Sequence, residues 1–231
     1  MFQEAINYPR NSDSVVKTVA IGGVLLVLSF LVVPTFLVFG YIVRSLRSVL
    51  GGDENPPVFD DWGDLLVDGV KAFAIGFVYS LVPTAIAVAA LVASGATLGL
   101  GGNGSGLAVG LIAIVAALAV TVVSLLLAYV VPAALVAWVR TDRLGAAFSP
   151  RELRVLAFSR TYATGWAVAL GIGLLASVAV SLLSTIVVGA VLAPFIVFYA
   201  NVAGFHAIGA AVREMPPVED GPETPVSQPA A

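Results

Sequence analysis

Charge and cysteine are scarce in this sequence. Only 11% of its 231 residues are charged and 59% are hydrophobic, with a mean hydropathy of +1.03, whereas soluble domains are about 25% charged. A soluble domain of this composition would lack polar surface. Cysteine is absent, which excludes disulfides, thiolate metal sites and a cysteine nucleophile. Lysine is limited to Lys17 and Lys71, against nine arginines, which fits a salt-adapted proteome. The net charge of −3 gives no indication of nucleic-acid binding, and we expect none.

Long uncharged runs occupy most of the chain. A bilayer core takes roughly 20 helical residues to cross, and lipid leaves no backbone group unpaired, so we expect membrane helices. The sequence predicts an all-α polytopic membrane protein with five to six membrane segments and amphipathic helices on the cytoplasmic face. The predicted segments are 18–43, 72–93, 107–139, 163–183 and 186–211. We expect a single membrane domain over 1–213 and a disordered cytoplasmic tail over 214–231, which is rich in proline and acidic residues.

The placement of basic residues orients the segments. Loop 94–106 has no charge and is rich in glycine and serine, so we predict a flexible loop outside the cell membrane. Loops 44–71 and 140–162 and the C-terminus are predicted to be cytoplasmic. Segment 18–43 leaves two alternatives open. A single span kinked at Pro34 places Arg10 and Lys17 outside, whereas a re-entrant hairpin that turns near Pro34 keeps all basic residues inside.

Two further sets of residues stand out within or beside the apolar runs. The prolines are predicted to mark helix kinks or turns: Pro34, Pro83, Pro132 and Pro194. Several aromatic residues are typical of either an interfacial belt or internal packing: Tyr41, Tyr79, Tyr129, Tyr199, Trp138 and Trp166. The apolar runs hold no Asp, Glu, Lys or Arg, and this argues against an ion-coupled transporter or pump.

The stretch PPVFDDWGDLLVDG (56–69) concentrates acidic residues. A helix starting near Val58 would place its four aspartates on one face, with the tryptophan at headgroup depth. This face is either a hydrated surface or a docking face for a membrane-protein partner or cations. The candidate docking residues are Asp60, Asp61, Trp62, Asp64 and Asp68. Arg44 and Arg47 are natural internal partners for some of these carboxylates.

Loop 140–162 is the basic counterpart. Ser149-Pro150 predicts a helix start, with Ser149 as the N-cap and Glu152 in the capping-box position. Juxtamembrane arginines attract anionic lipid headgroups, although the positive-inside rule also explains them. The candidate headgroup contacts are Arg140, Arg143, Arg151, Arg154 and Arg160.

Evidence for catalysis is weak. His206 is the single histidine, and an intramembrane histidine can mark a proton path or bond a neighbouring carbonyl. The sequence has no nucleotide-binding loop, no nucleophile–base pair and no zinc-ligand spacing. We therefore predict no catalytic residues, no cofactor and no metal.

The N-terminal third resembles a known family. An Ile-Gly-Gly, a proline, a Gly-Tyr before a basic helix, an Asp-Asp-Trp-Gly and an Asp-Gly follow in order, at Ile21–Gly23, Pro34, Gly40–Tyr41, Asp60–Gly63 and Asp68–Gly69. This order is similar to that of the domain of unknown function 4013 family, strongly over about residues 7–85 and by layout beyond. The resemblance implies a polytopic membrane protein of the kind common in salt-loving archaea, favours the hairpin at Pro34, and transfers no catalytic residue.

Three functional hypotheses follow. The first is a non-enzymatic scaffold or accessory subunit that binds a partner through the acidic stretch and anionic lipid through the arginines. The second is a transporter or lipid-handling protein for a neutral or lipidic substrate, since broken helices often line binding sites. The third is a membrane enzyme, or a factor that assists lipid or lipoprotein maturation, using Asp60, Asp61 and His206. The sequence gives no indication of oligomeric state.

Overall fold

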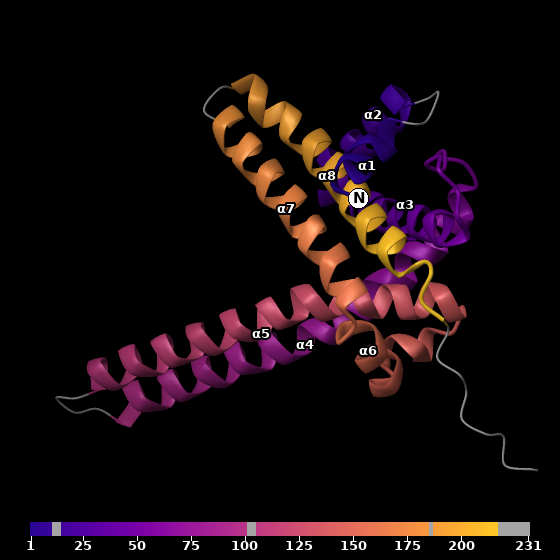
Figure 1. The fold of residues 1–231 in the computed structure, drawn as a ribbon. Helices are drawn as coiled ribbons and strands as arrows, with labels where there is room; N and C mark the ends of the chain where they lie inside the picture. Colours follow the sequence, from indigo (N-terminus) through magenta and orange to yellow (C-terminus); the bar gives the residue numbers. More distant parts are fainter. Residues whose placement is uncertain (11–14, 101–104, 185–186, 217–231) are drawn as a thin grey trace, which may run out of the picture.

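The computed structural model describes residues 1–10, 15–100, 105–184 and 187–216 (Figure 1). Every regular element in these ranges is a helix: α1 (Phe2–Asn7), η1 (Tyr8–Arg10), α2 (Val15–Val27), η2 (Leu28–Phe30), α3 (Val32–Gly51), α4 (Trp62–Leu100), α5 (Ser105–Thr141), η3 (Leu144–Phe148), α6 (Pro150–Ala157), α7 (Arg160–Leu183) and α8 (Val187–Val212). Five helices are long and apolar enough to cross a membrane, or six if the bent N-terminal pair counts as one span. The predicted all-α polytopic class is confirmed.

Two helical hairpins dominate the fold. α4 packs along α5, α7 packs along α8, and the two hairpins diverge from a common base (Figure 1). We call the space between them the fork. The base is the main core: in α5 the stretch Ala133–Val139 is buried, and it packs with Leu46 of α3, Leu156 of α6 and Ile208 of α8. Trp138 lies in this core, so it serves packing and not an interfacial belt.

Four side chains, which we call the aromatic belt, lie where the hairpins leave the base: Tyr79, Tyr129, Tyr162 and Trp166. Tyr129 and Tyr162 stack edge to face at 5.1 Å. Each belt residue donates a hydrogen bond to a backbone carbonyl of another segment, as when the Tyr79 hydroxyl donates to Ala147 O at 2.7 Å. These bonds fix both hairpins and the 142–159 connection to one another.

The hairpins beyond the aromatic belt match a bilayer in length and chemistry. From the belt to the hairpin tips, α4, α5 and α7 extend about 32–36 Å at 1.5 Å per residue, slightly more than the roughly 30 Å hydrocarbon core. Residues 80–128 and 167–205 contain no Asp, Glu, Lys or Arg, and large apolar side chains of these stretches are exposed. The sequence therefore folds into two uncharged arms with exposed apolar side chains, on a base that carries charged residues.

The first apolar run is divided at Leu31. Its extended backbone (φ −92°, ψ 95°) separates η2 from α3. Pro34 lies in the first turn of α3, where its missing N–H needs no partner. The side chains around the break, from Val27 to Val33, are mostly exposed and apolar. The helix thus breaks three residues before Pro34, and the choice between a single span and a re-entrant hairpin stays a prediction.

Other sequence boundaries need correction. The predicted flexible loop 94–106 is wrong for residues 94–100, which continue α4, and for 105–106, which begin α5. Unpaired backbone groups are unfavourable in apolar surroundings, so the helices extend as far as they can. The other three predicted prolines lie inside α4, α5 and α8, which continue on both sides. Most of the predicted tail 214–231 lies outside the described residues.

Candidate functional site

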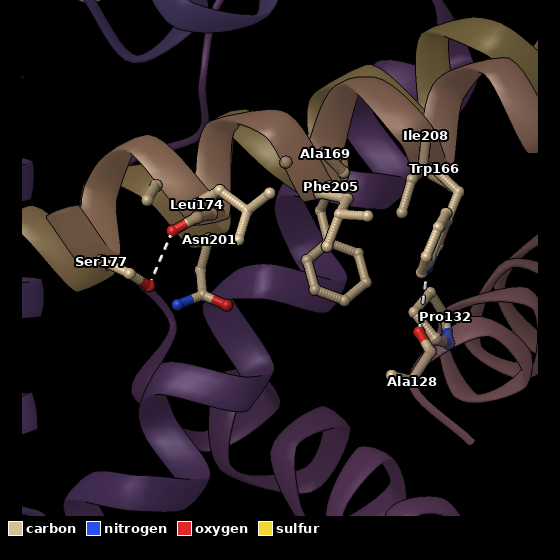
Figure 2. A pocket seen from close by; sticks show the side chains of 13 residues that line it. Ala128, Pro132, Trp166, Ala169, Leu174, Ser177, Asn201, Phe205 and Ile208 are labelled. Atoms are coloured by element: carbon tan, nitrogen blue, oxygen red, sulfur yellow. Dashed lines mark hydrogen bonds between the residues drawn. The ribbon is translucent and has the colours of Figure 1, made fainter. Parts of the chain in front are cut away.

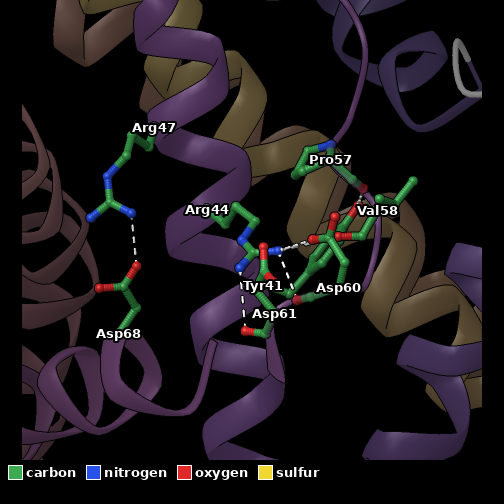
Figure 3. A network of polar contacts seen from close by, with 8 residues as sticks. All are labelled: Tyr41, Arg44, Arg47, Pro57, Val58, Asp60, Asp61 and Asp68. Atoms are coloured by element: carbon green, nitrogen blue, oxygen red, sulfur yellow. Dashed lines mark hydrogen bonds and ion pairs between the residues drawn. The ribbon is translucent and has the colours of Figure 1, made fainter. Parts of the chain in front are cut away.

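The first candidate site is the acidic stretch, and its centre is Arg44 of α3 (Figure 3). Nη1 donates to the carbonyl oxygens of Val58 (3.5 Å) and Asp60 (2.9 Å), and it also pairs with the Asp60 carboxylate. Nη2 donates to the carbonyl oxygen of Asp61 at 3.5 Å. The carbonyl groups of Val58 and Asp60 thus bond Arg44 and not helix amides, and the predicted start near Val58 is wrong. α4 begins at Trp62.

A second ion pair forms one helical turn further along α3. Arg47 Nη1 lies 2.7 Å from Asp68 Oδ2 (Figure 3). The predicted internal pairing of Arg44 and Arg47 with these carboxylates is confirmed. Asp60 and Asp68 are therefore already paired within the chain, although Asp60, like Asp61 and Asp64, is exposed.

The connection 52–61 between α3 and α4 is fixed by further contacts. Gly52 ends α3 in the left-handed region (φ 93°). The Tyr41 hydroxyl donates to Pro57 O at 2.9 Å. Its ring stacks on Phe59 at 4.2 Å, and Phe59 stacks in turn on Trp62 at 5.8 Å. Trp62 is half exposed at the end of this stack. The connection is thus clamped onto α3.

Two glycines set the distance between α3 and α4. A Cβ on Gly40 would collide with the carbonyl oxygen of Leu65, and one on Gly69 would collide with the carbonyl oxygen of Phe36. Both obstacles are backbone, so neither can move aside without separating the helices. In the same way, the α2 residues Gly22 and Gly23 lie under aromatic rings of α8. Four motif glycines, Gly22, Gly23, Gly40 and Gly69, therefore serve close helix packing, whereas Gly63 has open space around it.

The candidate docking residues consequently divide in two. Asp60 and Asp68 stabilise the α3–α4 arrangement, while Trp62, Asp61 and Asp64 face outward. Asp61 also adopts a positive φ of 45°, and its carbonyl accepts from Leu65 N at 3.1 Å. Partner docking through this stretch remains a prediction, with a smaller acidic surface than the sequence suggests.

The predicted headgroup arginines also differ in their contacts. Arg140 donates to the carbonyl oxygen of Met215. Arg143 forms an ion pair with buried Glu152, with 3.8 Å between Arg143 Nη2 and Glu152 Oε1. The others are exposed: Arg151, Arg154 and Arg160. The predicted cap of α6 is confirmed, since Ser149 Oγ accepts from Glu152 N at 3.5 Å and Pro150 opens the helix.

The second candidate site lies in the fork (Figure 2). A cavity of about 370 Å³, which we call the fork cavity, is bounded by α5, α7 and α8. Its walls are apolar at Pro132, Trp166 and Phe205. It shares lining residues with a further hollow of about 270 Å³ that follows α7 and α8 toward their tips. Together they form a groove with many small side chains, including Ala169, Gly173, Ala200 and Gly204.

Asn201 is the most polar residue of this groove, and Ser177 is its neighbour (Figure 2). Asn201 Nδ2 donates to Val197 O at 2.8 Å, and Ser177 Oγ donates to Gly173 O at 2.9 Å. Among the described residues, the carboxamide oxygen of Asn201 accepts no hydrogen bond. Asn201 lies about 10 Å beyond Ile208, the α8 residue that packs beside the aromatic belt, at 1.5 Å per residue. The exposed carboxamide of Asn201 therefore lies beyond the aromatic belt, in the uncharged stretch 167–205.

His206 has a packing role in the structure. Its ring stacks on Tyr8 at 4.2 Å, and its Nδ1 is buried without a hydrogen-bond partner among the described residues. The described part of the chain contains no group of three His, Cys, Asp or Glu side chains able to hold a metal ion. Asp60 and His206, proposed together for catalysis, are engaged by different partners, Arg44 and Tyr8.

Sequence reasoning did not find the fork. Asn201 is visible in the sequence as one of the few strongly polar residues in an apolar run, and this was the available signal. The small residues that surround it come from two helices, and Ala128 and Pro132 come from a third. Only the three-dimensional arrangement brings them together.

Comparison with known proteins bears on identity but not on activity. The chain matches the model of the family described as "Protein of unknown function (DUF4013)" over residues 25–189, which is more than half of its length. This range includes all the quoted motifs except Ile21–Gly23. No curated protein and no solved structure matches the chain significantly. The chain therefore belongs to the DUF4013 family, as a multi-pass integral membrane protein of unknown activity.

Proposed function

We propose that the chain is a non-enzymatic membrane scaffold or accessory subunit, and that the fork receives a transmembrane helix of its partner. The observation that carries the proposal is the exposed carboxamide of Asn201 in a groove of small side chains. Lipid tails offer no hydrogen-bond donor, so an unpaired carboxamide oxygen is unfavourable among them. A partner helix with a polar side chain supplies the donor, and such interhelical bonds contribute about 0.6–2 kcal/mol.

The shape of the groove supports a helix as its occupant. Ala169, Gly173 and Ser177 lie four residues apart on α7, in the small-xxx-small pattern that lets helix backbones approach closely. Gly204 of α8 lines the same cavity. The hydrogen bonds from Tyr162 and Trp166 to backbone carbonyls of α5 attach the start of α7 to the α4–α5 arm. The base of the groove is thus held in place, and such preorganisation lowers the entropic cost of binding a partner helix.

Photo-crosslinking in native membranes tests the proposal. A photoreactive phenylalanine analogue replaces Leu174, which lines the fork cavity and is 60% exposed. The matched control replaces Leu118 of distal α5, which is 62% exposed. We expect a discrete protein adduct from position 174 that Asn201→Leu abolishes, and none from position 118. Equal adducts from both positions would contradict docking in the fork.

Lipid binding is the second candidate function, and a separate cavity favours it. On another face of α7–α8, an open hollow of about 380 Å³ is lined almost wholly by apolar residues, among them Ile172, Phe195 and Tyr199. This volume is within the range of small-molecule sites. If crosslinking from position 174 yields only lipid adducts, the fork holds lipid and the lipid-handling hypothesis replaces the scaffold.

A further inference from the structure

α6 has an exposed face whose side chains change from basic to apolar along the helix. Arg151, Arg154, Val155 and Phe158 follow at helical spacing, and all four are exposed. Phe158 is 84% exposed. The opposite face holds buried Leu156 and is fixed to the core. The arginines therefore occupy the first turns, and the large apolar side chain occupies the end.

The apolar end of α6 lies at the level of the aromatic belt. The Tyr129 hydroxyl donates to Ala157 O at 2.6 Å, directly before Phe158. Phe148, at the other end of the connection, stacks on Tyr79 at 5.6 Å. Because the uncharged arms start at the belt, Phe158 lies at the boundary where bilayer hydrocarbon begins.

The exposed side chains around Phe158 combine two chemistries. Further exposed apolar residues lie on the same connection: Leu144, Phe148 and Val155. Arg160 follows Phe158 at the start of α7 and is also exposed. Interfacial helices bind membranes with this combination of arginines and buried aromatic side chains. Water is a poor partner for the apolar half, and a neutral protein surface is a poor partner for the arginines.

We propose that the exposed face of α6, with Arg160, is a binding surface for anionic lipid headgroups, and that Phe158 inserts into the bilayer beside them. The bilayer is the one occupant that offers a partner both to the arginines and to the exposed apolar side chains at the level of the aromatic belt. Positive charge on the arginines complements the headgroups, and acyl chains cover Phe158. This surface is independent of the fork, so it stands whether or not the fork docks a helix.

Depth measurement gives the first test. The natural chain has no cysteine, so Phe158→Cys carries a single nitroxide in vesicles of phosphatidylglycerol and phosphatidylcholine. Glu54→Cys, on the exposed 52–61 connection, is the matched control. We expect the label at 158 to collide with oxygen more than with a water-soluble nickel chelate, and the label at 54 to show the reverse. A water-exposed label at 158 would overturn the insertion.

Lipid selectivity gives the second test. Arg151, Arg154 and Arg160 are changed together to glutamine, and in a matched variant together to lysine. Spin-labelled lipids report the preference for phosphatidylglycerol over phosphatidylcholine at the protein surface. Each arginine contributes about a fivefold preference, so we expect at least a fivefold loss in the glutamine variant and retention in the lysine variant. An unchanged preference in the glutamine variant would overturn the proposal. If that variant does not fold, the depth measurement decides.

Discussion

Replacing Gly40 or Gly69 with alanine tests how closely α3 and α4 approach. In a helix, alanine is favoured over glycine by about 1 kcal/mol, so an unhindered site is stabilised by the change. At these two positions the new Cβ would lie well within 3.0 Å of a carbonyl oxygen of the opposite helix. Overpacking typically costs about 1–3 kcal/mol, and backbone obstacles place these sites at the upper end. The expected net effect is a destabilisation of about 1–2 kcal/mol for either variant.

Two other glycines of α4 serve as controls. Gly63 and Gly76 have no atom within 4 Å of the added Cβ, so Gly63→Ala and Gly76→Ala are expected to be neutral or stabilising. Thermal unfolding in detergent measures all four variants, at roughly 2–4 °C per kcal/mol for a chain of this size. The Gly40→Ala, Gly69→Ala double variant tests the geometry further. Once the helices have separated to make room for one Cβ, the second Cβ causes little further destabilisation. The losses of stability in the two single variants are therefore expected to be less than additive in the double variant.

The outcome that refutes this reasoning is simple. If Gly40→Ala and Gly69→Ala unfold at the same temperature as Gly63→Ala and Gly76→Ala, the two helices do not touch at these positions. Full additivity of the double variant would show that the two glycines act at independent contacts.

Three more predictions concern the connection 52–61 and the topology. Arg44→Ala is expected to destabilise the fold by about 1–2 kcal/mol, and Asp60→Asn by at most about 1 kcal/mol. The difference arises because three of the Arg44 acceptors are backbone carbonyls, which Asp60→Asn leaves in place. Equal losses of stability in thermal unfolding would contradict this. Because Asp61 has a positive φ, Asp61→Gly is expected to be neutral or stabilising, and Asp61→Val to destabilise the fold by about 1–2 kcal/mol. Thermal unfolding measures both variants. A valine variant as stable as the natural chain would show that the positive φ does not constrain this position. If the charged base is cytoplasmic, Ser105→Cys reacts with an impermeant maleimide on intact cells and Glu54→Cys only after lysis, and the reverse pattern would invert the proposed sidedness.

The features that sequence predicted correctly depend on local chemistry. Uncharged length alone indicated helices that cross a bilayer. The Ser149-Pro150 pair indicated the start of α6, because an N-cap acts on the backbone beside it. The pairing of Arg44 and Arg47 with the aspartates followed from their proximity along the chain.

The features that sequence did not predict depend on partners far along the chain. α4 starts at Trp62 and not near Val58, because the carbonyl groups of Val58 and Asp60 accept hydrogen bonds from Arg44. Glycine and serine content indicated a flexible loop at 94–106, but the apolar environment favours paired backbone over chain flexibility. The fork depends on tyrosine bonds between segments 28–68 residues apart, such as that from Tyr79 to Ala147, and no local pattern reveals these.

The divergence of the two arms has a mechanical consequence. Both arms leave one base and separate toward their tips (Figure 1), so the protein takes up more lateral area in one leaflet than in the other. Opening or closing the fork changes that difference in area. Lateral pressure in the bilayer therefore does work on the angle between the arms. We therefore expect bilayer composition to act, together with the belt bonds, on the angle between the arms.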